Sequence, residues 1–209
     1  MPFIGIVPPT QRVQGLFGGA TNAPIGTAPL NNIVDGTAQA LPGIVGWYKD
    51  PQFGRISVVA YAQAQASISY GDALIKVAGA ATTLSSAGAS VEAGAGVSFV
   101  KTAGTGSAQS GYAFQFAGVA AASVINTGHF FWRYISGYVP NARCGSVIAS
   151  GSPLVVAGST AGVLSAGLAS HWNATTTNGT AFVAVGYPIT TTDAADGSVA
   201  SIVLSGWYA

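Results

Sequence analysis

Few side chains in this sequence could do acid–base chemistry. The carboxylates are Asp35, Asp50, Asp72, Glu92, Asp193 and Asp196. Two such groups facing each other could hydrolyse a glycosidic bond. Four of the six, however, are adjacent to glycine or proline, in Asp35-Gly36, Asp50-Pro51, Gly71-Asp72 and Asp196-Gly197. Because aspartate next to these residues is typical of turns, we expect structural roles and no catalytic residue.

Metal and thiol chemistry have equally little support. His129, His171 and Cys144 have no partner ligand close by in sequence, and Asp193 with Asp196 gives a loop too poor in ligands for a dedicated calcium site. Cys144 is the single cysteine, which excludes an intrachain disulfide, and we expect it to be a small buried hydrophobe. The sequence predicts no metal and no cofactor.

Patterns that could bind phosphate or sugar also have simpler explanations. Gly94-Ala-Gly96 and Gly104-Thr-Gly106 lie in Ser/Ala-rich segments without a following helix, so we interpret them as turns. The glycosylation patterns at Asn173 and Asn178 are interpreted as turn chemistry. The aromatic residues Trp47, Tyr48, Trp172, Trp207 and Tyr208 could stack on sugars, but anchors of a protein interface are the favoured interpretation.

Short apolar runs between Gly, Ser, Thr and Asn predict an all-β domain, a sandwich or a barrel, over residues 52–209. In residues 129–135 both strand faces are apolar enough to be at least half buried, and in the last strand Ala200, Ile202 and Leu204 share one face. The expected strands are residues 55–62, 67–70, 73–78, 97–102, 112–116, 129–136, 146–149, 154–157, 181–187 and 199–207.

A weak internal repeat joins two of these regions. Residues 111–138 and 179–207 show similar patterns of Gly, Ala, Phe and aromatic residues, offset by 68 to 69 positions. Two similar hairpin units would explain this similarity, and so would compositional bias.

Residues 1–51 hold seven of the ten prolines, which predicts an extended N-terminal arm because proline interrupts sheet ladders. Val34, Ala38 and Leu41 lie at helical spacing, which allows one short helix within residues 31–40. The arm is too apolar for a solvated linker, so we expect it to lie along a protein surface. Its first eleven residues contain Pro2, Pro8 and Pro9 and no basic region, and we expect a chain made and kept in a cytoplasm.

Composition says more about assembly than about chemistry. Lysine and arginine number 7 and the acids 6, while 49% of the residues are hydrophobic. An ordinary soluble domain has about a quarter of its residues charged, and that charge keeps neighbours apart. The scattered charges make no basic stripe for nucleic acid, and no run is apolar enough to span a membrane. We therefore expect apolar surface to be buried between subunits.

The C-terminal part resembles virion structural proteins of tailed bacteriophages, in particular capsid decoration (cement) proteins, over about residues 70–209. The residues that carry the resemblance are Ala113-Phe-Gln-Phe-Ala-Gly-Val, Gly128-His-Phe-Phe-Trp-Arg-Tyr-Ile-Ser-Gly-Tyr-Val, Ala149-Ser-Gly-Ser-Pro-Leu and Gly197-Ser-Val-Ala-Ser-Ile-Val-Leu. The arm of residues 1–51 departs from that family.

The resemblance implies a non-enzymatic protein of the virion head that binds the major capsid protein and copies of itself, with a trimer favoured. The residues expected at interfaces are Phe3, Ile4, Ile6, Phe17, Trp47, Tyr48, Trp172, Trp207 and Tyr208. The alternatives are a tail, collar or fibre-associated virion protein, a carbohydrate- or receptor-binding module, and an enzyme.

Overall fold

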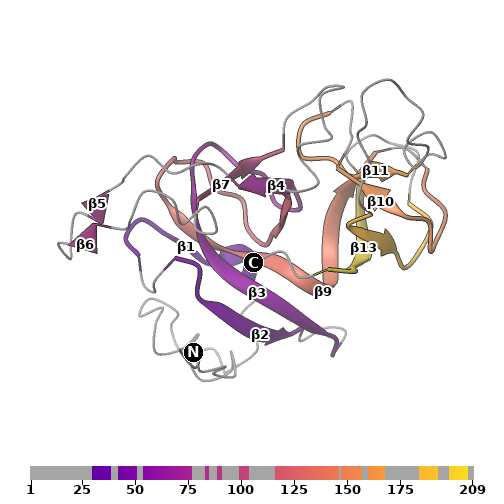
Figure 1. Cartoon of the computed structure of the whole chain (residues 1–209), viewed down its shortest axis with the longest axis horizontal. Helices are drawn as coiled ribbons and strands as arrows, with labels where there is room; N and C mark the ends of the chain where they lie inside the picture. The colour runs from indigo at the N-terminus through magenta and orange to yellow at the C-terminus, as the bar shows by residue number, and fades with distance from the viewer. Residues whose placement is uncertain are drawn as a thin grey trace.

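The computed structural model describes residues 30–38, 42–50, 54–76, 83–84, 89–90, 99–103, 116–145, 147–156, 160–167, 184–192 and 198–206. Strands dominate these residues, with one 3-10 turn, η1 (Leu30–Asn32). The structure confirms the prediction of an all-β fold with a barrel at its centre. A separate two-stranded pair, β5 (Thr83–Leu84) with β6 (Ala89–Ser90), lies outside the main sheet (Figure 1).

Five strands close the barrel. They are β3 (Ile56–Ala64), β4 (Ala73–Lys76), β7 (Phe99–Thr102), β8 (Phe116–Ala120) and β9 (Phe130–Cys144). The ring runs β3, β9, β8, β4, β7 and back to β3. The closing contact between β3 and β7 is parallel, with Gln63 opposite Phe99, and the other four contacts are antiparallel. Closure leaves these strands with fewer open edges for unwanted pairing.

Alanines line much of the barrel because two large side chains of β9 fill it. Phe131 is opposite Ala62 in β3, and Arg133 is opposite Ala60. All four residues are buried. A narrow barrel accommodates large side chains from one strand only where the facing strands carry small ones.

Gly118 allows β8 to lie close to β9. Its φ is +99°, and a Cβ added there would lie 1.9 Å from the carbonyl oxygen of Tyr134. No L-residue fits that position without displacing the neighbouring strand. This single glycine therefore sets the distance between two barrel strands.

The long strand β9 extends beyond the barrel, and the strands that follow it in the same hydrogen-bonded sheet form an open part, which we call the second sheet. Its later half pairs with β13 (Ser198–Leu204), which pairs in turn with β12 (Gly186–Pro188), β10 (Leu154–Val155) and β11 (Ser165–Ala166). A bulge between Ala200 and Ile202 leaves Pro140 out of the ladder, where its missing N–H costs nothing. In Figure 1 this second sheet lies beside the barrel, at the right.

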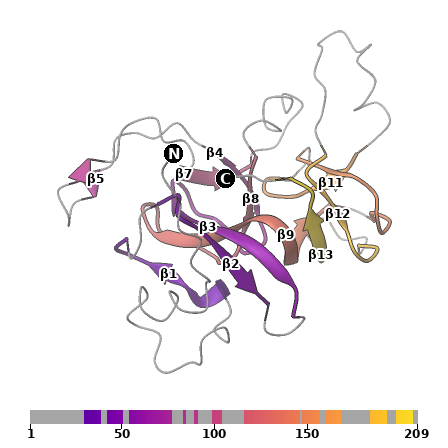
Figure 2. The same ribbon diagram turned by 60° about the horizontal axis from the view of Figure 1, so that its bottom comes forward.

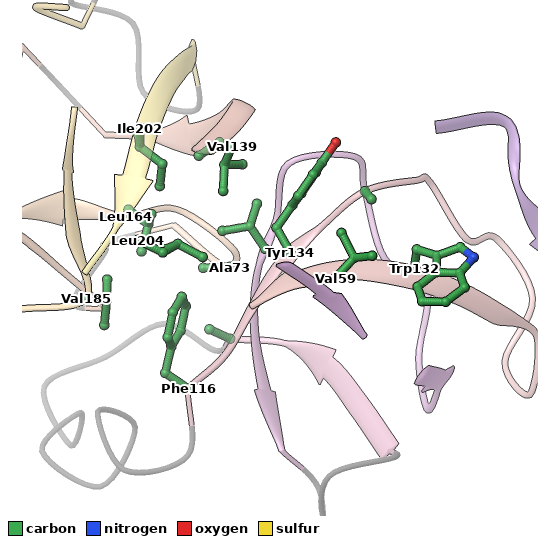
Figure 3. Packing of buried hydrophobic residues seen from close by; sticks show 14 of the residues in the cluster. Val59, Ala73, Phe116, Trp132, Tyr134, Val139, Leu164, Val185, Ile202 and Leu204 are labelled. Atoms are coloured by element: carbon green, nitrogen blue, oxygen red, sulfur yellow. The ribbon is translucent and has the colours of Figure 1, made fainter. Parts of the chain in front are cut away.

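The main core lies between the outer surface of the barrel and the second sheet. Val139, Ile202 and Leu204 of the second sheet are buried in one cluster with Tyr134 and Phe116 from the barrel strands, and Figure 3 shows these side chains. Ala200, Ile202 and Leu204 do share a buried face, as predicted, and both faces of residues 130–135 are buried. Packing of the two sheets against each other thus depends on β9, which belongs to both.

The described part of the predicted arm belongs to the main sheet. β1 (Val34–Asp35) pairs with β9, and β2 (Val45–Lys49) pairs with β3 along its whole length. Leu30 is only 2% exposed. The boundary predicted at residue 51 therefore lies inside the fold, because the Pro and Gly there mark turns, such as Pro42-Gly43, and not the absence of sheet.

The short helix allowed within residues 31–40 is absent from residues 31–38, which the structure describes. These residues form the end of η1 and then strand β1. Pairing with β9 provides backbone hydrogen bonds that one isolated helical turn next to Gly36 could not match.

The two regions of the internal repeat both contain an antiparallel pair. In β8 and β9, Val119 is opposite Tyr134. Tyr187 lies 68 positions after Val119, and Val203 lies 69 positions after Tyr134. These two residues are opposite each other in β12 and β13. The two pairs thus have equivalent registers. Val119 and Tyr134 are buried, however, whereas Tyr187 is exposed.

Candidate functional site

Asp72 is used to join the barrel to the second sheet. Its side chain is 4% exposed and accepts hydrogen bonds from Arg143 Nη1 at 2.6 Å, from Thr102 Oγ1 at 2.9 Å and from the Ser69 amide at 2.9 Å. Arg143 lies in the part of β9 that belongs to the second sheet. The carboxylate is fully engaged in these contacts, so its arrangement suits a structural clamp and not an acid–base group.

The other described carboxylates also face the fold. Asp35 accepts a hydrogen bond from the Tyr61 hydroxyl at 2.8 Å, and burial raises the pKa of this carboxyl group. Asp50 is buried at the start of the turn that connects β2 to β3. Glu92, Asp193 and Asp196 lie outside the described residues. No two described carboxylates are shown to form a pair, so the structure gives no support to a glycosidase site.

Arg133 is a charged group inside the barrel. It is 0% exposed, and its guanidinium donates to the carbonyl oxygen of Ala117 on β8. Burial lowers its pKa to about 10. The side chain ties β9 to β8 from inside the barrel and fills the space that the neighbouring alanines leave.

The candidates for thiol and metal chemistry are separated. Cys144 is buried, and its burial raises the pKa of the thiol to about 11, so the unreactive neutral form prevails at neutral pH. His129 lies next to β9, and His171 lies outside the described residues. Within the described ranges, no three His, Cys, Asp or Glu residues come together as a metal site. Those ranges also contain no helix of the length and hydropathy needed to cross a membrane.

Exposed apolar side chains, in contrast, gather on one side of the sheet. β2, β3, β9, β13 and β12 are hydrogen-bonded in that order, and Figure 2 shows them following one another. The side opposite the main core carries Trp47, Ile56, Tyr187 and Val199, which are 39%, 59%, 42% and 55% exposed. We call these four residues the apolar face. Ile125 and Val147 are the other large exposed hydrophobic residues in the described ranges.

Strand register places the four residues on the same side. Trp47 is opposite Val58, and Ile56 precedes Val58 by two positions, so both point the same way. Val58 is opposite Ser136, two residues before Tyr138. Tyr138 in turn is opposite Val203 of β13, and Val203 is opposite Tyr187 of β12. Val199 lies four positions before Val203 on the same strand and so points to the same side. The four residues of the apolar face therefore lie on the same side of β2, β3, β13 and β12, with β9 between the two pairs of strands.

Exposed charge near the apolar face is basic. Lys49 is exposed and opposite Ile56 in the ladder, while the Arg55 guanidinium lies over the Tyr138 ring at 5.0 Å. Lys101, on β7, is the other exposed charged residue in the described ranges. The described acids are buried or half-buried, so they leave the positive charges of Lys49 and Arg55 at one end of the apolar face.

The predicted interface residues divide into three groups. Trp47 lies on the apolar face, as a contact residue must. Tyr48 points the other way, is 5% exposed, and packs edge-on against Tyr134, so its ring is inside the core. The remaining seven, Phe3, Ile4, Ile6, Phe17, Trp172, Trp207 and Tyr208, lie outside the described residues. The interface itself stays a prediction.

Sequence reasoning missed Ile56, Tyr187 and Val199. A signal existed in the last strand, where Val199 and Val203 are apolar on the side opposite Ala200, Ile202 and Leu204. A strand with one buried face normally places polar residues on the other. Apolar residues on both faces therefore indicated a second contact surface there.

Comparison with known proteins finds a likeness in three dimensions to a bacteriophage protein. No protein-family model matches the chain, and no curated protein matches it. Among solved structures, the chain is similar to the head fiber gp8.5 N base of bacteriophage phi29, with 14% sequence identity and a TM-score of 0.41. The match covers 71% of this chain and 94% of that one.

Proposed function

We propose that this chain is a non-enzymatic structural protein of a bacteriophage particle and that it decorates the capsid. The observation that carries the proposal is the apolar face, where Trp47, Ile56, Tyr187 and Val199 are exposed on one side of a continuous sheet. Large exposed apolar residues on one side of a sheet are typical of surfaces that bind another macromolecule. The resemblance of residues 70–209 to capsid decoration proteins of tailed bacteriophages supports a phage head as the particle that this chain binds.

The energetics suit binding in many copies. Full burial of one large apolar side chain contributes about 1.5 to 3 kcal/mol, before the cost of association is subtracted. Four such side chains give a modest single contact. A shell presents the same contact many times, so modest contacts add up to a large effect on the whole particle.

The described polar groups favour a structural role over an enzymatic one. Asp72 is held by Arg143 and Thr102, and the Cys144 thiol is buried with its pKa raised to about 11. Each of these groups holds the fold together or is shielded from solvent. They do not converge on a shared substrate position, which acid–base or nucleophilic catalysis requires.

The test is the mass ratio of this chain to the major coat protein in purified particles of the phage that encodes it. A ratio near one copy per coat subunit is expected for decoration of the whole lattice. A few copies per particle would instead support the alternative of a tail, collar or fibre-associated protein. Absence from purified particles would overturn the proposal altogether.

A further inference from the structure

We propose that the apolar face docks onto a different protein, at a surface whose apolar centre is flanked by carboxylates that contact Lys49 and Arg55. This inference rests on the proposed function and specifies which surface of the chain meets the shell. The partner surface is defined by its chemistry: apolar where Trp47 and Ile56 touch it, and acidic beside them.

Burial and strand register carry the apolar half of the inference. Trp47 and Ile56 lie on adjacent strands, on the same side, and are 39% and 59% exposed. Tyr187 and Val199 extend the same side across β12 and β13. Tryptophan and tyrosine contribute most to binding when they are desolvated at the centre of a contact.

Charge carries the other half. Lys49 and Arg55 are exposed beside Trp47 and Ile56. Asp72 pairs with Arg143, and no ion pair is found between Lys49 or Arg55 and a carboxylate of the described residues. Positive groups at the edge of an apolar contact select a partner with negative groups at the matching positions.

The same charges argue against pairing of this face with a second copy. Two copies facing each other in the same orientation would bring Lys49 and Arg55 together, and in either orientation the described acids, which are buried or half-buried, offer these cations no carboxylate. Like charges brought together disfavour an interface. Copies of this chain that associate should therefore use another surface.

The experiment uses phage particles assembled without this chain, to which the purified full-length protein is added. Two double variants alter the face, Trp47→Ser with Ile56→Ser and Lys49→Glu with Arg55→Glu. Two matched controls change the same kinds of residue elsewhere, Ile125→Ser and Lys101→Glu, since Ile125 is 82% exposed and Lys101 is an exposed cation on β7. Circular dichroism and thermal unfolding confirm that each variant folds.

We expect the apolar double variant to weaken binding about 30-fold or more and the charge reversal about tenfold or more, with both controls close to wild type. Raising the salt concentration from about 0.05 to 0.5 M should weaken the wild type and leave the charge-reversed variant nearly unchanged.

Two results would overturn the inference while leaving particle binding intact. One is wild-type affinity in both face variants. The other is a face variant that changes the oligomer's sedimentation coefficient without changing particle binding, since the occupant would then be a second copy. Failure of the wild-type protein to bind the particles at all would overturn the proposed function and this inference with it.

Discussion

Asp72 illustrates how the rare charges of this chain are used. Its carboxylate joins residues that are far apart in sequence, Ser69, Thr102 and Arg143, and so holds β4, β7 and the second half of β9 together. Arg133 has a similar role inside the barrel, where it bonds to β8. Because these charged side chains are engaged inside the fold, they add little charge to the surface.

Replacing Asp72 with alanine is expected to destabilise the protein by about 3 kcal/mol, because the partly buried Arg143 would lose its counter-charge and Thr102 its acceptor. Chemical denaturation followed by fluorescence measures the change. Lys101→Ala, at an exposed site, is the control and should change stability by less than about 0.5 kcal/mol. Equal stability of the two variants would refute the clamp.

Cys144 gives a pH-dependent prediction. Burial raises the pKa of its thiol from 9.0 to about 11 in the folded state. The native state therefore favours the neutral thiol, and this contribution is fully present below pH 9 and is lost as the pH rises from 9 toward 11. Wild type should lose stability over this range faster than Cys144→Ala does. Identical pH profiles in denaturant titrations would contradict the effect.

At the level of elements, Gly118 is a position where β8 lies close to β9. Gly118→Ala should destabilise the protein by more than about 4 kcal/mol, because the new Cβ would lie 1.9 Å from the Tyr134 carbonyl oxygen. Gly46→Ala in β2 is the matched control, since a Cβ there meets nothing within 4 Å. Thermal unfolding of both variants decides the point, and a Gly118→Ala protein as stable as the control would disprove the close approach.

Truncation tests where the folded unit begins. Removal of residues 1–29 should leave the barrel intact, whereas removal of residues 1–38 also deletes Leu30, Ile33 and β1 and should cost at least about 3 kcal/mol. If the arm reaches a neighbouring capsomer, the shorter deletion will also reduce the number of copies bound per particle. Unfolding of the shorter variant would place the boundary earlier in the chain.

The strands that sequence reasoning found best are those with large β-branched or aromatic residues. Residues 55–62 and 73–78 correspond to β3 and β4, and residues 129–136 to the first half of β9. The prediction of 112–116 ended where β8 begins, because Ala117, Gly118 and Ala120 have weak strand propensity and are strands only through contact with β4 and β9.

Other elements depended on contacts distant in sequence. The end of β9 was missed because Gly137 and Pro140 suggest a turn, yet a positive φ at Gly137 and a bulge opposite Ser201 carry the strand on to Cys144. β2 was missed among the prolines of residues 1–51. Residues 146–149 were predicted as a strand, but residues 147–149 form none.

At the level of the whole molecule, one long strand joins a closed barrel to an open sheet, and the side away from their shared core presents the apolar face. Composition predicted the need for a covering partner, since charged residues make up only 6% of the chain. Composition could not say where that partner binds. The location follows from register across β2, β3, β9, β13 and β12, which is a property of the fold.

The most direct test of this account is a cryo-electron microscopy reconstruction of the phage particle at a resolution that traces strands. We expect this chain on the head surface, with Trp47, Ile56, Tyr187 and Val199 turned toward the shell and shell carboxylates beside Lys49 and Arg55. A reconstruction in which the chain is bound with these four side chains turned toward solvent, or in which it is missing from the particle, would contradict the account.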